Sequence, residues 1–334
     1  MSYATPASLL KVDLHPGKPP ILHVDTPGDA RAWAADHRDA LRTLVTEHGA
    51  VLVRGLHLHD ADQAGTVLHR LATALMTDRE SFAPRRTYAP GVYSSSAWPP
   101  TQPMCMHHEL SHTLQPPGLM LFACLTAPAT GGATAIADAS AVLEALPNEL
   151  VERFEQEGWL LSRTYNGEIG APYSEAFGTD DRRAVEAYCR TAGITSAWQP
   201  DGSLRTHQRR PAVTVHPVTG RRCWFNQITF FNEWTIEPES RDYLIDVYGA
   251  DSLPFNTRFG GGDPIGPDIV QLLNDTYAAH TARAPWRAGD LMLVDNVRTA
   301  HSREAFQGPR EVLVAMAEPL APAPCPPPAE MSSR

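Results

Sequence analysis

Hydrophobic residues recur at helical spacing near the start of the chain. Between residues 29 and 49 they return every three or four positions, which predicts a helix whose buried face is made by Trp33, His37, Leu41, Leu44 and Val45. Gly49 suits the end of that helix, because glycine adopts the positive φ that a C-terminal cap often needs. The apolar run AVLVRGL (50–56) then predicts a buried strand, and residues 60–76 predict a second helix.

The pattern changes after residue 80. Short runs typical of β strands follow one another between Pro, Gly and Asn residues: LMLFACLT (119–126), ATAIAD (133–138), AVTVH (212–216), RCWFNQITFF (222–231), DLMLVDN (290–296) and EVLVAMAE (311–318). Helical patterns interrupt them at 140–157, 181–192 and 265–283. Strands and helices do not alternate regularly and no glycine-rich phosphate loop follows a strand, so a parallel α/β sheet is disfavoured. The pattern predicts an all-β core with added helices, an α+β chain built on a sandwich or barrel.

The composition is that of a globular chain large enough to bury a core. Of 334 residues, 43% are hydrophobic and 20% are charged. Six of the 30 prolines lie in the last 16 residues, which predicts an extended and disordered tail. We therefore expect an N-terminal segment (1–25), a single domain (26–318) and a Pro-rich tail (319–334).

The net charge and the cysteine content limit the partners and the cellular compartment that we expect. The net charge of −10 argues against a nucleic-acid or anionic-membrane partner, since both are polyanionic. No run of 18 apolar residues and no long apolar stretch at the N-terminus is present. The five cysteines are an odd number without C-x-x-C spacing, which favours reduced, mostly buried thiols. A cytoplasmic protein is expected.

The stretch CMHHELSHT (105–113) contains two overlapping metal-site patterns. The first is His-Glu-x-x-His, in which His108 and His112 would bind zinc and Glu109 would act as the base of a hydrolase. That pattern requires a helix, because residues i and i+4 then lie on one face. Here WPPTQP precedes the motif and LQPPG follows it, so a helix would be short.

The second pattern is His-x-Glu, in which His107 and Glu109 share one face of a strand or tight turn. It is half of the two-His-one-carboxylate set that binds non-haem iron. Such a site needs a distant histidine and a means of holding a cosubstrate. The segment GDLMLVDNVRTAHSREAFQGPREVLVAM near the C-terminus supplies both.

These segments, together with PPGLMLFACLTAPATGGATAIAD and WFNQ, closely resemble the iron(II)/2-oxoglutarate-dependent oxygenases of the taurine dioxygenase and clavaminate synthase type, from about residue 30 to residue 317. The resemblance implies a double-stranded β-helix (jelly roll) and the cofactors Fe(II), 2-oxoglutarate and dioxygen. It implies His107, Glu109 and His301 as metal ligands, and Thr134 and Arg310 as the residues that bind 2-oxoglutarate. His108 stands where close relatives often have Asn, which leaves the substrate specificity open.

The strand pattern around Arg310 supports this assignment. Alternation places Arg310 on one face with Val312, Val314 and Met316, so the guanidinium points into a barrel and needs an anionic partner. The alternative is a salt bridge from the edge of a loop to a nearby acid. Thr134 could add a hydroxyl hydrogen bond to the same ligand, or could be an ordinary β-branched strand residue.

Three further residues are candidates for substrate contact, each with a structural alternative. His108 could line the cavity or face solvent, Asn226 could bind substrate or form a structural hydrogen bond, and Arg303 could meet a substrate carboxylate or a neighbouring acid. We expect Arg85 and Arg86 to form a solvated loop pair, with contact to an anionic substrate or carrier as the alternative. The aromatic residues are expected to belong to the core, among them Trp98, Trp224, Phe225, Phe230, Phe231 and Trp234.

The predicted function is hydroxylation of an unactivated C–H bond of a small polar metabolite. Several similar relatives act on amino acids in natural-product biosynthesis, so we expect an amino acid, either free or tethered to a carrier protein. Desaturation, epoxidation or cyclisation would use the same iron site, whereas Glu109 argues against halogenation. A zinc hydrolase is the distant alternative. The sequence leaves the oligomeric state open.

Overall fold

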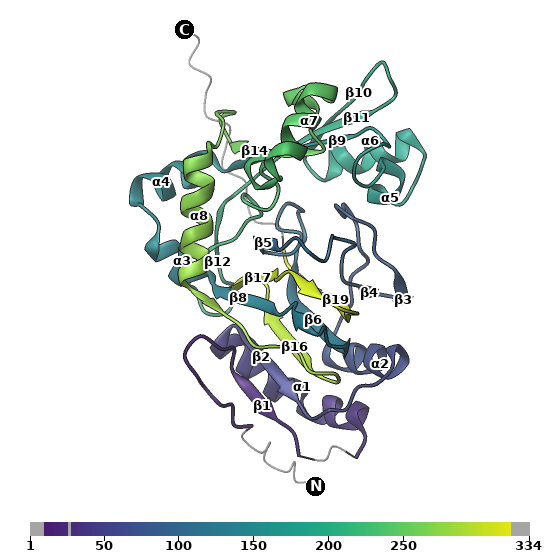
Figure 1. The fold of residues 1–334 in the computed structure, drawn as a ribbon, viewed down its shortest axis with the longest axis vertical. Helices are drawn as coiled ribbons and strands as arrows, with labels where there is room; N and C mark the ends of the chain where they lie inside the picture. The colour runs from purple at the N-terminus through teal and green to yellow at the C-terminus, as the bar shows by residue number, and fades with distance from the viewer. Residues whose placement is uncertain (1–9, 26–27, 322–334) are drawn as a thin grey trace.

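The computed structural model describes residues 10–25 and 28–321 (Figure 1). The predicted tail, 319–334, lies mostly outside the described residues, as do the first nine residues of the predicted N-terminal segment. Residues 21–23 of that segment form the first strand of the largest sheet. The predicted domain boundaries stay a prediction.

The largest sheet has seven strands. Their order is β1 (Ile21–His23), β2 (Ala50–Arg54), β16 (Leu291–Asp295), β6 (Pro117–Thr126), β19 (Glu311–Pro319), β4 (Val92–Ser94) and β3 (Thr87–Ala89). β1 runs parallel to β2, and the other neighbours are antiparallel. The strands predicted at 50–56, 119–126, 290–296 and 311–318 are thus confirmed, and all four lie in this sheet.

Both faces of the large sheet are covered. On one face, Leu313 and Ala315 of β19 pack with residues of α1 (Ala30–His48) and α2 (Ala61–Leu71). Gly49 ends α1 with φ 82°, as predicted. α2 ends five residues before the predicted end, because the following segment turns back to the sheet, where Leu75 bridges to Ala317.

The opposite face of the large sheet packs on a smaller one. This second sheet contains, in order, β15 (Thr281–Ala282), β8 (Thr134–Asp138), β17 (Thr299–Arg303) and β5 (Met104–His107). Val312, Val314 and Met316 of β19 share a buried cluster with Phe122 of β6 and Ile136 of β8. The alternation predicted for β19 is confirmed, and the space between the sheets is where the candidate site lies.

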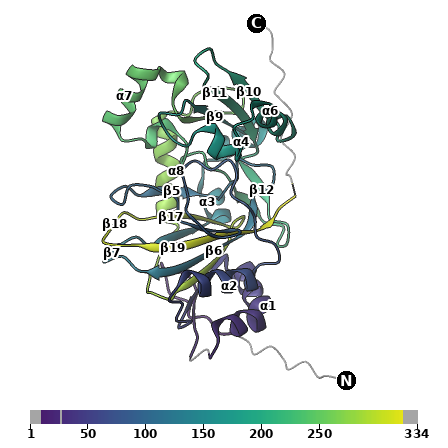
Figure 2. The same ribbon diagram turned by 90° about the vertical axis from the view of Figure 1, so that its right-hand side faces the viewer.

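A third sheet lies beyond the small sheet, at the end of the molecule away from α1 and α2 (Figures 1 and 2). Its strands are β10 (Ile194–Trp198), β11 (Leu204–Arg210), β9 (Trp159–Tyr165) and β14 (Phe255–Phe259). The same region of the chain carries α5 (Tyr173–Phe177), α6 (Arg182–Thr191) and α7 (Pro238–Tyr248). The sequence pattern predicted α6 but missed this sheet, because its strands are rich in Arg, Thr and Ser.

Two other predictions need correction. The helix expected over 140–157 is two helices, α3 (Ala139–Ala145) and α4 (Asn148–Glu157), because Pro147 forces the residue before it out of the helical region. The strand expected over 222–231 ends at Trp224, as β13 (Arg222–Trp224), which pairs with β12 (Val213–Val215).

α8 (Pro267–Ala279) confirms the third helical pattern. The remaining pair, β7 (Thr130–Gly131) with β18 (Phe306–Gln307), lies beside the start of β19.

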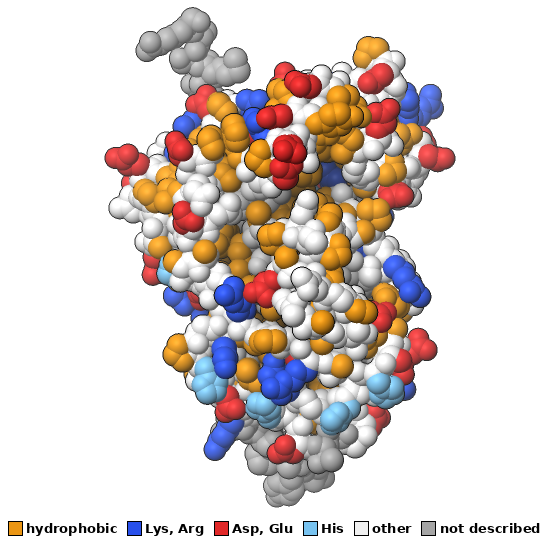
Figure 3. All heavy atoms as spheres, in the orientation of Figure 1, with side chains coloured by type: hydrophobic (Ala, Val, Ile, Leu, Met, Phe, Trp, Pro, Cys, Tyr) orange, Lys and Arg blue, Asp and Glu red, His pale blue; other side chains and the backbone are white. Residues whose placement is uncertain are grey.

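The surface carries charges of both signs. Figure 3 shows acidic and basic side chains scattered over one face, without a continuous basic field. Within the described part of the chain, no helix is long and apolar enough to cross a membrane.

Four cysteines are described, all with free thiols, and three of them are buried. The mixed α+β class is confirmed.

Candidate metal centre and active site

Two adjacent strands of the small sheet bring His107 and His301 together. β17 pairs antiparallel with β5, and His301 lies directly opposite His107 in the register. Their ring centroids are 4.4 Å apart. Directly opposed residues on neighbouring strands are close enough for two imidazoles to reach one ion.

Glu109 completes the cluster from the turn that follows β5. Its Oε2 lies 3.6 Å from Nε2 of His107 and 3.6 Å from Nε2 of His301. The backbone of Glu109 is held by the side chain of Asn296, which accepts from its N–H at 2.8 Å and donates to its carbonyl at 2.9 Å. All three side chains are buried, and one ligand atom from each lies within 4.8 Å of the others.

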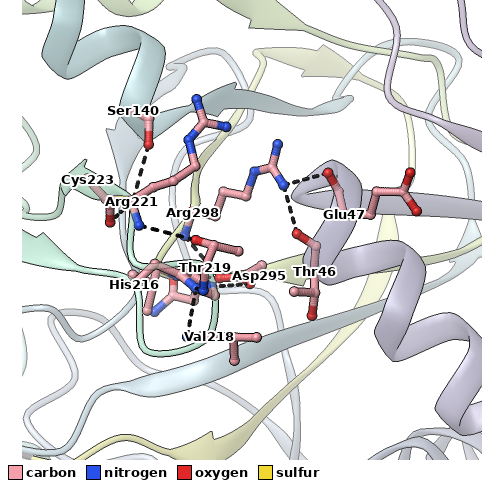
Figure 4. A network of polar contacts seen from close by, with 12 residues as sticks. Thr46, Glu47, Ser140, His216, Val218, Thr219, Arg221, Cys223, Asp295 and Arg298 are labelled. Atoms are coloured by element: carbon pink, nitrogen blue, oxygen red, sulfur yellow. Dashed lines mark hydrogen bonds and ion pairs between the residues drawn. The ribbon is translucent and has the colours of Figure 1, made fainter.

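Asn296 belongs to a braced turn between β16 and β17. Asp295 accepts hydrogen bonds from the N–H groups of Val297 and Arg298, and its other oxygen pairs with His216 at 2.8 Å. Figure 4 shows Arg298 reaching from this turn to the carbonyls of Thr46 and Glu47 at the end of α1. The turn therefore fixes both Asn296 and the start of the strand that carries His301.

The protonation states of the cluster suit a cation. Burial raises the pKa of Glu109, but Arg85 and the two histidines outweigh it and hold that pKa well below its ordinary value. Burial and the nearby His107 lower the pKa of His301 to about 4, so its imidazole is neutral at pH 7. Nδ1 of His107 donates to the carbonyl of Cys105 at 2.9 Å, which directs its Nε2 toward Glu109. One carboxylate and two imidazoles fit a divalent transition metal.

The two residues expected to bind 2-oxoglutarate line the same small cavity as these three. Nε of Arg310 donates to the carbonyl of Gly132 at 3.0 Å, and Nη1 is 3.4 Å from Oγ of Ser95. Among the described residues no carboxylate lies within salt-bridge distance of Arg310. Burial lowers its pKa to about 10, so it remains a cation at pH 7. Oγ of Thr134 accepts a hydrogen bond from Nε1 of Trp286 at 3.3 Å and keeps its own hydrogen for another acceptor.

The three candidates for substrate contact lie in different places. Arg303 lines the cavity, but its Nη1 and Nη2 donate to the carbonyls of a preceding loop, those of Trp98, Pro99 and Gln102. His108 is fully buried and bonds the carbonyl of Asn296. The amide of Asn226 donates to the carbonyl of Ala212 and accepts from the N–H of Ile228. Neither His108 nor Asn226 lines the cavity.

The zinc pattern is wrong for this structure. Residues 109–112 form turns rather than a helix. Nδ1 of His112 bonds the amide oxygen of Gln227 at 2.6 Å, and its Nε2 lies 3.8 Å from Glu80. In the described parts of the chain, the one group of His, Cys, Asp or Glu with converging ligand atoms is the cluster of His107, Glu109 and His301.

Arg85 is the residue that sequence reasoning placed wrongly. Its side chain is 6% exposed and donates from Nη2 to Oε1 of Glu109 at 2.8 Å, whereas Arg86 is exposed. Burial lowers the pKa of Arg85, but the carboxylates of Glu109 and Asp78 outweigh it and raise that pKa above its ordinary value. No local pattern separates the two arginines, because the contact depends on how a loop folds back over β5.

A second cavity adjoins the first. Met104 lines both, and the ring of Phe230, which lines the second, lies 4.4 Å from the ring of His107. Phe82 and Trp98 stand in the same wall, in edge contact at 6.1 Å. Trp98 is thus a cavity residue, contrary to the expectation of a core role. Phe230 belongs to the core and also lines the cavity, and Trp224 and Phe231 belong to the core as expected.

Comparisons with known proteins found similar sequences and a similar fold. The family model described as taurine catabolism dioxygenase TauD, TfdA family, matches residues 15–316. The dapdiamide synthesis protein DdaC of Enterobacter agglomerans is 33% identical over 279 residues, covering 84% of this chain and 85% of DdaC. A clavaminate synthase-like protein of Arabidopsis thaliana is 29% identical over 287 residues, covering 83% of each. The crystal structure of PvcB from Pseudomonas aeruginosa covers 98% of both chains with a TM-score of 0.54 at 16% identity, which shows a shared fold.

Proposed function

Because the chain belongs to the TauD/TfdA family of Fe(II)/2-oxoglutarate-dependent dioxygenases, we propose that it hydroxylates an unactivated C–H bond of a small polar metabolite. The family confirms the resemblance found in the sequence, and the enzyme uses Fe(II), 2-oxoglutarate and dioxygen. The observation that carries the proposal is one cavity that contains the His107–Glu109–His301 cluster together with Arg310, a cation without a carboxylate partner among the described residues.

We assign the metal to His107, Glu109 and His301. These three side chains would hold Fe(II) and leave coordination positions for the keto acid and dioxygen. When bound, this iron site supplies the oxidation, in which 2-oxoglutarate and dioxygen give succinate and carbon dioxide while one oxygen atom enters the substrate C–H bond.

Arg310 and Thr134 are assigned to the far carboxylate of 2-oxoglutarate. A buried guanidinium requires an anion, and its fork matches a carboxylate. The hydroxyl of Thr134 is oriented by Trp286, so its hydrogen is free to reach the same carboxylate. The apolar residues around them, Phe122, Val312 and Val314, keep water from the space between keto acid and metal.

An amino acid, free or tethered to a carrier protein, is our proposed substrate. DdaC is named for dapdiamide synthesis, and PvcB is described as an oxygenase from an isonitrile synthetic pathway, so both relatives belong to natural-product biosynthesis. Of the three substrate candidates we favour Arg303, which lines the cavity; the contacts of His108 and Asn226 favour structural roles. Desaturation, epoxidation and cyclisation remain alternatives at the same site.

The finer features follow from the same assignment. We propose that the large and small sheets form the two halves of a double-stranded β-helix, with the third sheet as an insertion. We also propose a single oxygenase domain spanning 26–318 in a cytoplasmic enzyme.

The test is an anaerobic titration of the protein with Fe(II) and 2-oxoglutarate, recording the visible metal-to-ligand charge-transfer band. The wild type is expected to give the band and His301→Ala to lose it. A folded, iron-loaded wild type without a band would contradict the assignment. Amino acids and carrier-bound aminoacyl groups are then screened for substrate-dependent succinate release, and the product mass separates oxygen gain from loss of two hydrogens.

A further inference from the structure

Arg85 lies between two buried carboxylates beside the metal cluster. Its Nη2 donates to Oε1 of Glu109 at 2.8 Å, and its Nε lies 3.5 Å from Oδ2 of Asp78. The side chains of Arg85, Glu109 and Asp78 are 6%, 8% and 11% exposed. Asp78 is itself held, because its N–H donates to the hydroxyl of Tyr93 at 3.0 Å. One hydrogen bond to Glu109 and one longer ion pair to Asp78 therefore restrict the movement of this guanidinium.

The two oxygens of Glu109 therefore have different surroundings. Oε2 faces Nε2 of both His107 and His301, at 3.6 Å in each case. Oε1 points the other way and accepts a charge-assisted hydrogen bond from Arg85. Rotating the carboxylate so that both oxygens face the metal would break this bond and leave the buried guanidinium facing Asp78 alone.

We infer that Arg85 is a positioning residue that restricts Glu109 to ligation through one oxygen. The inference rests on the proposed iron site. A carboxylate that chelates through both oxygens would occupy one more coordination position. With 2-oxoglutarate filling two of the three open positions, the position lost would be that of dioxygen. By this argument Arg85 keeps the site open through its contact with Glu109.

The consequences of losing Arg85 are specific. Glu109 would lose the contact that orients it, and loss of such an outer contact typically weakens metal binding about 10–100-fold. In a variant saturated with excess metal, the freed Oε1 would compete with any added ligand for the last open coordination position of the metal. Binding of 2-oxoglutarate would persist, because Arg310 and Thr134 do not contact Arg85 or Asp78 through any recorded hydrogen bond or ion pair.

The experiment compares wild type, Arg85→Met and Arg86→Met. Arg86 is the matched control, since it is the adjacent arginine, is exposed, and packs over the ring of Tyr88 rather than on Glu109. The first measurement is Mn(II) affinity without keto acid, from the EPR signal of free Mn(II). The second is the EPR signal of the nitric oxide adduct in protein saturated with Fe(II) and 2-oxoglutarate, which reports the last open position.

Arg85→Met is expected to bind Mn(II) about 10-fold more weakly and to lose most of the nitric oxide signal while keeping the charge-transfer band. Arg86→Met should match wild type in both. An unchanged nitric oxide signal in metal-saturated Arg85→Met overturns the inference. Should that variant not fold, Arg85→Met with Asp78→Asn removes the cation together with its second partner, and the same outcomes apply.

Failure of the proposed function is recognisable separately. If wild type gives no charge-transfer band with 2-oxoglutarate, the keto-acid assignment fails. The Mn(II) titration then still decides whether Arg85 orients Glu109 toward a metal, because it involves no keto acid. Equal Mn(II) affinity in wild type and Arg85→Met would count against the inference even in that case.

Discussion

His301 lies directly opposite His107 across the β5–β17 pairing, and the pairing of these two strands is irregular on one side of this pair. After His301 the register shifts, so that Arg303 pairs with Met104. Such an irregularity bends the strand and redirects the side chains that follow it. Here it accompanies the hydrogen bonds that Arg303 donates to the carbonyls of the 98–102 loop.

Mutations can distinguish the iron pattern from the zinc pattern in CMHHELSHT. His301→Ala removes one of three ligands, so the fall in Fe(II) or Mn(II) affinity should exceed the roughly 10–100-fold that an outer contact is worth. His112→Gln should leave metal affinity unchanged. It removes the imidazole that bonds Gln227, and the expected loss is about 1–3 kcal/mol of unfolding free energy.

Metal titration and urea unfolding of both variants check these expectations. A His112→Gln variant that folds but no longer binds metal would revive the zinc pattern. A His301→Ala variant with wild-type affinity would remove His301 from the ligand set.

The sequence predicted those parts of the molecule in which the spacing of the residues and their chemical type indicate the same structure. β19 is an example, because strict alternation placed Val312, Val314 and Met316 on the face that the structure buries between the sheets. The His-x-Glu spacing was informative for a similar reason: His107 ends a strand and Glu109 follows in a turn only two residues later, so proximity is local.

What the sequence could not supply depends on contacts between distant segments. The strand β11 reads LRTHQRR, and its arginines look solvent-exposed until Arg210 is found donating to the carbonyls of His112 and Ala192. Arg85 and Arg86 are adjacent in sequence, yet only Arg85 turns inward to Glu109. No periodicity encodes such a choice.

Arg310 should govern the affinity for 2-oxoglutarate and not that for metal. Replacing it by Met leaves the keto acid's far carboxylate without its cation, and losing one partner of a buried charge pair costs at least about 2 kcal/mol, or roughly 30-fold. The Kd of 2-oxoglutarate, measured from the charge-transfer band, is expected to rise by at least this factor. Metal affinity should stay at the wild-type value.

The matched control for that variant is Arg222→Met. Arg222 lies on β13 with a side chain 55% exposed and pairs with Glu155 at the surface. Its loss should leave the Kd of 2-oxoglutarate unchanged. Equal affinities in Arg310→Met and Arg222→Met would show that another group holds the carboxylate.

Acid should destabilise the metal-free enzyme before the carboxylates titrate. Burial lowers the pKa of His108 to about 3, and burial with the neighbouring His107 lowers that of His301 to about 4. In the unfolded chain both titrate near pH ~6.5, so below that pH the unfolded state binds more protons. The stability from these neutral imidazoles is complete above pH ~6.5 and is lost as the pH falls toward their folded values.

At about pH 5 each of the two histidines is expected to contribute a loss of about 2 kcal/mol. Urea unfolding of metal-free protein at about pH 7.5 and about pH 5 measures the sum. In His108→Asn the difference between the two pH values should shrink by about 2 kcal/mol, the share of this one imidazole. A pH difference that stays the same in this variant would mean that other groups cause the acid sensitivity.

Gly132 should control where Arg310 points. It has φ +69°, its carbonyl accepts from Nε of Arg310, and a Cβ added there would lie 2.9 Å from Cβ of Phe306 and 3.2 Å from Cδ of Arg310. The same Cβ would lie 2.7 Å from Cγ of Pro128. Gly132→Ala is therefore expected to shift the carbonyl and the side-chain stem that position the guanidinium, and to strain the backbone. The Kd of 2-oxoglutarate is expected to rise several-fold, since misplacing a charged hydrogen-bond partner forfeits about 1 kcal/mol or more.

Gly220 provides the control for backbone strain, because it has the same φ of +69° and a Cβ added there would meet nothing within 4 Å. Gly220→Ala should lose about 1–2 kcal/mol of unfolding free energy, the cost of placing an L-residue in the left-handed region. Gly132→Ala should lose more, because its added Cβ also clashes with its neighbours. Only Gly132→Ala should weaken 2-oxoglutarate binding. If the two variants bind the keto acid equally, the clash with Arg310 is relieved elsewhere, and the glycine turn does not position the cosubstrate.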